Sequence, residues 1–215
     1  MRLNTIIRFI LITITMMAAA TLQMARADTY TALVVGDSIS AAYGLRESEG
    51  WVSLAEQQLR KKGHDVTLVN ASISGDTTVG GLRRLPDALE RFSPDLLIIE
   101  LGGNDGLRGY PTNAMQQNIE DMANLALESD ASVLILGMLI PSNYGQAYLK
   151  KFSQAFADAA ANTDSAFVPF LLEPIAQDRN YFQPDGIHPT AEAQPLLVDH
   201  VMPALLELIE TEQAL

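Results

Sequence analysis

Five short apolar runs, separated by segments with helical spacing, constrain the fold of this chain more than any other feature. Continuous apolar runs of this length are typical of strands that are buried on both faces, and helical connections make neighbouring strands parallel. The pattern therefore predicts one parallel sheet of about five strands with helices on both faces. The runs are Tyr30–Val35, Val66–Val69, Leu96–Leu101, Val133–Met138 and Ala166–Val168.

The segments between these runs predict the helices. We expect Pro86, Pro195 and Pro203 to interrupt or offset the helices that contain them. Asn113 is the expected N-cap of its helix, and Trp51 is expected to lie in the core. The expected helical regions are Trp51–Lys62, Val79–Phe92, a stretch that begins near Asn113, Ala147–Ala161 and Ala191–Glu210.

The first 27 residues have the composition of an export signal. Arg2 and Arg8 supply positive charge, Phe9–Leu22 is mostly apolar, and Ala25–Ala27 offers small residues for cleavage. A retained membrane anchor is the alternative, but the apolar stretch is short for a span of about 20 residues and contains threonines. We therefore expect cleavage near Ala27, a periplasmic or secreted protein, and no stable membrane insertion after the signal is removed.

The rest of the chain, residues 28–215, is expected to form one domain and a monomer. The sequence has no cysteine, which excludes disulfides, thiolate metal ligands and a cysteine nucleophile. The signal carries three of the 14 basic residues and none of the 26 acidic ones, so the net charge of the rest is −15. This acidity argues against nucleic acid as a partner.

The first predicted strand ends in Gly36-Asp37-Ser38, which presents a serine. In open α/β sheets, ligands bind just beyond the carboxyl ends of the strands. We interpret Ser38, which follows such an end, as a catalytic nucleophile. The alternative is an ordinary turn, because glycine, aspartate and serine all favour turns.

A base and an orienting carboxylate for Ser38 can come from one late loop. A serine hydroxyl is a poor nucleophile until a neighbouring base takes its proton, and a carboxylate fixes the tautomer of that base. His188 and Asp185 can fill these two roles. The other histidines have simpler interpretations, since His64 follows a helix end and is expected to be exposed, while His200 lies in the last helix as a surface or packing residue.

Acyl transfer at Ser38 would also need donors for the oxyanion of the tetrahedral intermediate. The candidates are the backbone N–H groups of Ser38 and Gly75 and the side-chain amide of Asn104. Glycine lets a backbone approach a ligand closely, and asparagine supplies a neutral donor on a short arm. Each of these residues also has an alternative role in a simple turn.

Four short motifs in this order resemble the sequence blocks of the SGNH, or GDSL-type, hydrolases. They are Gly36–Ser40, Gly75 in its loop, Gly102–Asp105 and Asp185–Pro189. Over essentially the whole chain after the signal, the sequence is similar to exported bacterial members that act as thioesterases, lysophospholipases and arylesterases. This similarity is clearest in Asn70–Thr77, Leu101–Gly109, Pro141–Gly145 and Asp185–Pro189.

The resemblance implies a flavodoxin-like three-layer α/β/α fold and a serine hydrolase that cleaves thioesters and esters of fatty acyl groups. It implies an acyl-enzyme intermediate, with Ser38 as nucleophile, His188 as base and then acid, and Asp185 as orienting carboxylate. Ser38, Gly75 and Asn104 would form the oxyanion hole. The reaction it implies requires neither a metal nor an organic cofactor, and its substrates are small acyl esters or thioesters.

The choice of substrate is less constrained by the sequence. Ile140, Pro141 and Tyr144 are expected to line a groove for an acyl chain, although ordinary packing explains them equally well. A carbohydrate O-acetyl esterase on the same fold is an alternative, but few aromatic residues lie near the motifs. Another alternative is a non-catalytic flavodoxin-like protein that binds an anion. The negative charge of Asp37 in the expected anion-binding turn argues against this alternative.

Overall fold

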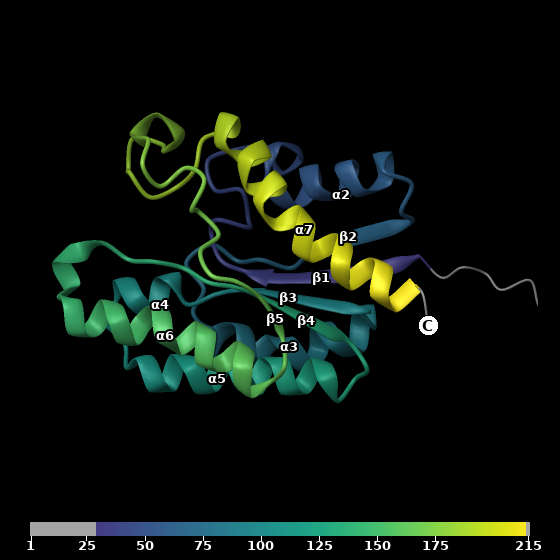
Figure 1. Cartoon of the computed structure of the whole chain (residues 1–215), viewed down its shortest axis with the longest axis horizontal. Helices are drawn as coiled ribbons and strands as arrows, with labels where there is room; N and C mark the ends of the chain where they lie inside the picture. Colours follow the sequence, from purple (N-terminus) through teal and green to yellow (C-terminus); the bar gives the residue numbers. More distant parts are fainter. Residues whose placement is uncertain (1–28, 214–215) are drawn as a thin grey trace, which may run out of the picture.

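The computed structural model describes residues 29–213, in which five parallel strands form one sheet (Figure 1). The strand order is β2-β1-β3-β4-β5, which is the flavodoxin-like order. The predicted parallel sheet of five strands is therefore confirmed. The expected export signal lies outside the described residues. The strands are β1 (Tyr30–Gly36), β2 (Val66–Asn70), β3 (Leu96–Glu100), β4 (Ser132–Leu136) and β5 (Ala166–Val168).

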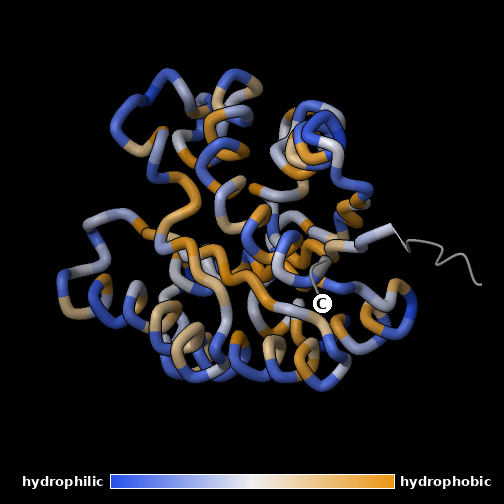
Figure 2. The backbone as a smooth tube through the Cα atoms, turned by 45° about the vertical axis from the view of Figure 1, so that its right-hand side comes forward, coloured by the Kyte–Doolittle hydropathy of each residue, from blue (hydrophilic) through white to orange (hydrophobic). Residues whose placement is uncertain are grey.

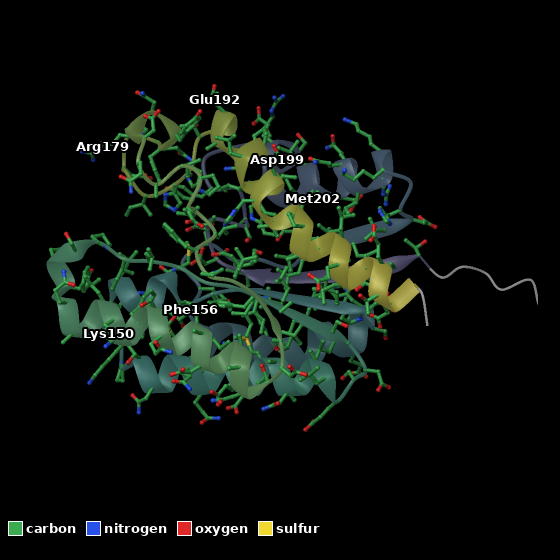
Figure 3. All side chains as sticks on the ribbon, in the orientation of Figure 1. Lys150, Phe156, Arg179, Glu192, Asp199 and Met202 are labelled. Carbon is green, nitrogen blue, oxygen red and sulfur yellow. The ribbon has the colours of Figure 1, made fainter. Side chains whose placement is uncertain are left out.

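Helices cover both faces of the sheet and bury its apolar side chains. Helices α2 (Trp51–Lys61) and α7 (Gln194–Gln213) cover one face, and α3 (Thr78–Phe92), α5 (Thr112–Leu127) and α6 (Gln146–Asn162) cover the other (Figure 1). Apolar residues are concentrated along the central strands in Figure 2. Phe156 on α6 and Met202 on α7, labelled in Figure 3, are both buried, and Trp51 is fully buried as expected.

Two features of the helices differ from a simple reading of the sequence. Pro86 lies inside α3 and Pro203 inside α7, and both helices continue through the proline. The lost backbone bond at Pro86 is tolerated because α3 keeps its buried face against the sheet. Pro195 falls in the first turn of α7, where a backbone N–H has no helical acceptor. Helix α5 has Pro111 as its N-cap, so Asn113 lies in the first turn and does not cap the helix.

The register of the strands brings three loops to one place. Val34 in β1 pairs with Asn70 in β2, and Gly36 pairs with Glu100 in β3, so the carboxyl ends of these strands lie side by side. Between β5 and the short 3-10 turn η4 (Ala191–Ala193), the chain returns over this edge in an irregular loop, drawn in yellow-green in Figure 1. The short helix α4 (Gly103–Leu107) follows β3 at the same edge.

Candidate active site

Ser38 lies in a turn that begins directly after β1. The Asp37 carboxylate accepts a hydrogen bond from the backbone N–H of Ile39 at 3.0 Å, and the Ser38 carbonyl accepts one from the N–H of Tyr43 at 3.0 Å. These bonds hold the turn while the Ser38 side chain remains half-buried at the edge of the sheet. The local sequence thus places a hydroxyl where this fold binds ligands.

The late loop brings Asp185 and His188 to Ser38. Asp185 Oδ2 lies 2.7 Å from His188 Nδ1, and His188 Nε2 lies 2.8 Å from Ser38 Oγ. Since the carboxylate is an acceptor, the Nδ1 proton faces Asp185, and Nε2 is free to accept from the serine hydroxyl. The structure therefore brings together the three side chains that the sequence analysis selected.

The Asp185 carboxylate is fixed from both sides. Its Oδ1 accepts hydrogen bonds from the backbone N–H groups of Ile187 and His188, at 2.9 and 3.0 Å. The bond from the His188 ring, followed by these two backbone bonds, lowers the pKa of Asp185 to about 2. Asp185 is therefore a carboxylate at any pH near neutrality, as an orienting group for histidine must be.

The residues that carry the three candidate oxyanion donors, Ser38, Gly75 and Asn104, line one cavity. Among the described residues, the backbone N–H groups of Ser38 and Gly75 donate to no protein acceptor. The Asn104 amide donates to Asp37 Oδ2 at 2.9 Å, which leaves its second N–H free. Three N–H groups that donate to no acceptor among the described residues are thus available beside the Ser38 hydroxyl.

Backbone geometry that only glycine adopts readily supports two of these donors. Gly75 has φ 80° in the loop after β2, and its carbonyl accepts a hydrogen bond from Arg108 at 3.0 Å. Gly102 has φ 115° at the start of α4, and a Cβ there would lie 2.7 Å from the Phe156 ring. A larger residue at position 102 would displace the helix that carries Asn104.

The cavity at Ser38 has a volume of about 940 Å³, and most of its walls are apolar. Ile140 and Pro141 line it, as expected for residues that contact an acyl chain. Tyr144 is not among the lining residues, because its hydroxyl donates to the Leu107 carbonyl at 2.6 Å and its ring packs near Tyr148. The structure therefore does not bring Tyr144 into the expected groove.

Several lining residues were missed by the sequence analysis. They come from the turn after Ser38 and from the late loop, where irregular backbone gives no periodicity to read. A preference for apolar residues near Asp185 is the one signal in the sequence that could have found some of them. The missed residues include Tyr43, Phe170, Leu172, Phe182 and Ile187.

Two buried carboxyl groups behind Ser38 were also missed. Glu100, the last residue of β3, is fully buried, and its Oε2 accepts a hydrogen bond from Ser40 Oγ at 2.7 Å. Burial, together with the nearby charge of Asp37, raises the pKa of Glu100 well above its usual range. Burial likewise raises the pKa of Asp37 to about 6. A carboxylate inside an otherwise apolar strand was the available signal for Glu100.

The other two histidines lie apart from this site. His64 is not exposed as expected, since only 17% of its side chain is accessible and its Nε2 lies 3.9 Å from Glu210 Oε1. His200 is partly buried in α7, and its Nε2 lies 3.0 Å from the Phe170 carbonyl, in agreement with a packing role. In the described part of the chain, His188 is therefore the one histidine that contacts Ser38.

Within residues 29–213, no group of three or more histidine, aspartate or glutamate side chains is arranged to hold a metal ion. No helix in that range combines the length and apolarity that are needed to cross a bilayer.

A flavodoxin-like sheet with a serine, a histidine and an aspartate in hydrogen-bonded series is characteristic of a serine hydrolase. Residues 34–195 match the GDSL-like lipase/acylhydrolase family, and the chain belongs to this family. With the named relatives described next, this makes the chain an SGNH-type serine esterase.

Two named relatives and one solved structure illustrate the similarity. The chain is 50% identical to Esterase TesA of Pseudomonas aeruginosa over 184 residues, which cover 86% of this chain and 92% of the relative. It is 36% identical over 189 residues to Thioesterase 1/protease 1/lysophospholipase L1 of Escherichia coli K12, with 88% of each chain covered. A crystal structure of TesA aligns with a TM-score of 0.81 at 50% identity, covering 83% of this chain and 99% of that one.

Proposed function

We propose that the chain hydrolyses esters and thioesters of fatty acyl groups through an acyl-enzyme on Ser38, with His188 as general base and Asp185 as its orienting carboxylate. The observation that carries this proposal is the series of contacts from Asp185 Oδ2 to His188 Nδ1 at 2.7 Å and from His188 Nε2 to Ser38 Oγ at 2.8 Å. Relatives that are named esterase and thioesterase support the same class of reaction.

In the first half-reaction, Ser38 Oγ attacks the carbonyl carbon of the substrate while its proton moves to His188 Nε2. The carbonyl electron pair moves onto its oxygen, and Asp185 stabilises the imidazolium. When the tetrahedral intermediate collapses, the bond to the leaving group breaks and His188 donates its proton to the departing alkoxide or thiolate. Ser38 then carries the acyl group.

The oxyanion of this intermediate would be bound by the N–H groups of Ser38 and Gly75 and by the free N–H of Asn104. Preorganised donors favour the transition state because the negative charge develops where they already point, and the loss of one typically lowers kcat by about 10²–10³. Asn104→Ala should therefore lower kcat by about this factor. Unchanged activity in that variant would remove Asn104 from the oxyanion hole.

In the second half-reaction, a water molecule takes the place of the serine hydroxyl. His188 accepts a proton from the water as its oxygen attacks the acyl carbon, and then returns a proton to Ser38 as the ester bond breaks. The fatty acid leaves and the free enzyme is restored. No metal or organic cofactor takes part in these steps.

The cavity supports acyl chains longer than acetyl as substrates. Leu139, Ile140 and Pro141 line one part of it, and Phe170 and Leu172 line another. Apolar walls of this kind favour a hydrocarbon chain, because its transfer from water contributes about 0.8 kcal/mol per CH₂. A carbohydrate O-acetyl esterase would need polar or stacking contacts for a sugar, and the rings of Tyr43, Phe170 and Phe182 line the same cavity, so this activity stays the second candidate.

The first experiment is the measurement of kcat/KM on p-nitrophenyl esters from acetate to palmitate, with Ser38→Ala as the control. We expect a preference for medium or long chains and the loss of that activity in Ser38→Ala. A sharp preference for acetate would favour the sugar deacetylase. Turnover that does not depend on Ser38 would contradict the proposed nucleophile, and no turnover on any ester would favour a binding protein.

We further propose export and cleavage of residues 1–27, followed by a single-domain monomer that acts on small molecules and binds no nucleic acid. The support is the composition of the signal and the net charge of −15 that remains after it. Cell fractionation and N-terminal sequencing test this location. An intact N-terminus in the membrane fraction would favour the retained anchor instead.

A further inference from the structure

Two segments of the chain must stay aligned for the proposed reaction to proceed. The nucleophile turn, residues 37–45, carries Ser38, and the acid–base loop, residues 182–189, carries Asp185 and His188. The hydrogen bond from Ser38 Oγ to His188 Nε2 joins them, but it breaks when Ser38 is acylated. The alignment must therefore depend on contacts that do not change during the reaction.

Gln183 supplies such a contact. Its side-chain Nε2 donates to the Tyr43 carbonyl in the nucleophile turn at 2.7 Å, and to the Pro189 carbonyl in its own loop at 3.1 Å. In the described part of the chain, the bond to Tyr43 is the one hydrogen bond besides Ser38–His188 that joins residues 37–45 to residues 169–190. A single amide thus bridges the two catalytic segments.

The orientation of this amide is unambiguous. Both of its partners are carbonyl oxygens, which only accept, so the NH₂ group must face them. Gly44 makes the approach possible, because a Cβ at that position would overlap Gln183 Oε1. A side chain of the same shape without N–H donors would lose both bonds.

The position of Gln183 is coupled to that of His188 by the backbone. The Gln183 N–H donates to the His188 carbonyl at 2.7 Å, and the Gln183 carbonyl accepts from Gly186 at 2.8 Å. The Tyr43 ring also lies against the His188 ring, with 4.4 Å between centroids. A displacement of Gln183 would therefore also displace the His188 imidazole, because backbone hydrogen bonds hold both residues in one loop.

We propose that Gln183 is a positioning residue that holds the acid–base loop in register with the nucleophile turn, so that His188 Nε2 stays within reach of Ser38 Oγ through both half-reactions. This inference rests on the proposed function of Ser38 and His188. Gln183 does not touch the reacting atoms, and its effect is transmitted through the position of His188.

The test compares Gln183→Met and Gln183→Glu with the parent enzyme. Methionine has a similar length without donors, and glutamate keeps the shape but turns carboxylate oxygens toward two carbonyls. We expect the acylation rate constant, measured as the burst of p-nitrophenolate, to fall about 10- to 100-fold, because a small displacement of a catalytic group has effects of that size. The substrate dissociation constant, obtained from the concentration dependence of the burst rate, should change little.

A second measurement separates positioning from a general structural role. The proton between His188 Nδ1 and Asp185 lies inside the acid–base loop, so its low-field ¹H NMR resonance should persist in both variants. Gln117→Met and Gln117→Glu are the matched controls, since Gln117 is exposed on α5 and donates only to Asp121 on the same helix. These controls should acylate at the parental rate.

Two outcomes would overturn the proposal. One is acylation within about two-fold of the parent in both Gln183 variants. The other is loss of the low-field resonance together with a lowered Tm, which would mean that Gln183 maintains the internal fold of the loop. Ser38→Ala, measured in parallel, keeps the inferences distinguishable, because a fully active Ser38→Ala defeats the proposed nucleophile whatever the Gln183 variants do.

Discussion

At the scale of single residues, Asp37 links the nucleophile turn to Asn104. Its Oδ1 accepts from the Ile39 N–H and its Oδ2 accepts from the Asn104 amide, so one carboxylate sets both the turn and the direction of the amide. Burial raises the pKa of Asp37 to about 6. The cost of burying this carboxylate is offset because each of its oxygens accepts a hydrogen bond. Asp37 thus decides which way Asn104 presents its N–H.

We predict that Asp37→Asn lowers kcat by about 10²–10³, close to the effect of Asn104→Ala. The new amide cannot accept at both positions, so the Asn104 side chain would lose its acceptor or turn its oxygen toward the substrate. Steady-state kinetics on a p-nitrophenyl ester measure the effect.

The double variant Asp37→Asn/Asn104→Ala is the control. If Asp37 acts through Asn104, the double variant should be no slower than Asn104→Ala, because coupled residues are not additive. Fully additive losses would contradict this mechanism.

At the scale of elements, a buried contact ties α3 to α4. Asp105 on α4 accepts hydrogen bonds from the Thr78 hydroxyl at 2.6 Å and from the Thr78 N–H at 3.0 Å, and Asn118 on α5 donates to the same hydroxyl at 2.9 Å. Thr78 begins α3 just after the Gly75 loop. The contact therefore fixes the helix starts on which two of the oxyanion donors depend.

Thr78→Val should lower the free energy of unfolding by about 1–3 kcal/mol, because Asp105 Oδ1 and the Asn118 amide both lose the Thr78 hydroxyl as their partner, while the backbone N–H of residue 78 still donates to Asp105 Oδ2. Thr78→Ser keeps the hydroxyl and should cost clearly less. Urea unfolding of both variants measures the difference. Equal losses in the two would mean that the methyl group, and not the hydrogen bonds, stabilises this contact.

A second element-scale feature is the free edge of β2. The outward-facing N–H of Leu68 donates to Glu56 at 2.8 Å, and the outward-facing carbonyl of Val66 accepts from Arg60 at 2.9 Å. Both side chains come from α2, and they occupy backbone groups that could otherwise pair with another chain.

The double variant Glu56→Ala/Arg60→Ala should therefore associate as its concentration rises. Size-exclusion chromatography with light scattering, over a range of concentrations, follows this change. Gln57→Ala/Lys61→Ala alters exposed residues of the same helix and should behave as the parent does. A strictly monomeric Glu56/Arg60 variant would show that its side chains do not protect the edge.

At the scale of the whole molecule, buried and exposed carboxyl groups respond to pH in opposite directions. Burial raises the pKa of Asp37 to about 6 and that of Glu100 well above its usual range, so the folded chain holds more protons than the unfolded chain above about pH 4. Hydrogen bonds lower the pKa of Asp185 and of the partly exposed Glu49 to about 2, so the contribution of these two groups to stability is lost as the pH falls below about 4.

The free energy of unfolding should therefore be higher near pH 5 than near pH 8. Reduced repulsion among the acidic groups acts in the same direction. Urea unfolding at the two pH values tests this, and Glu100→Gln should show a smaller difference between them because one raised titration is removed. Glu90→Gln, at an exposed site on α3, is the control. Equal pH differences in the parent and Glu100→Gln would contradict the role of Glu100.

The sequence by itself determined the order and type of the strands and helices. Apolar runs and helical spacing are local signals, and both follow from which faces must be buried. It also located Ser38, Gly75 and Asn104, because a parallel sheet brings the loops that follow its strands to one edge. Asp185 and His188 were selected from a late loop because together they supply the base and the orienting carboxylate that a serine nucleophile needs.

Only the tertiary structure decided what surrounds those residues. Whether Tyr144 faces the cavity, and which carbonyls Gln183 and Asp37 reach, depends on contacts between segments far apart in the chain. The tolerance of α3 for Pro86 likewise reflects burial of the rest of its face, which outweighs a local preference. Such contacts leave no periodic signal, since they depend on distances that exist only after the chain has folded.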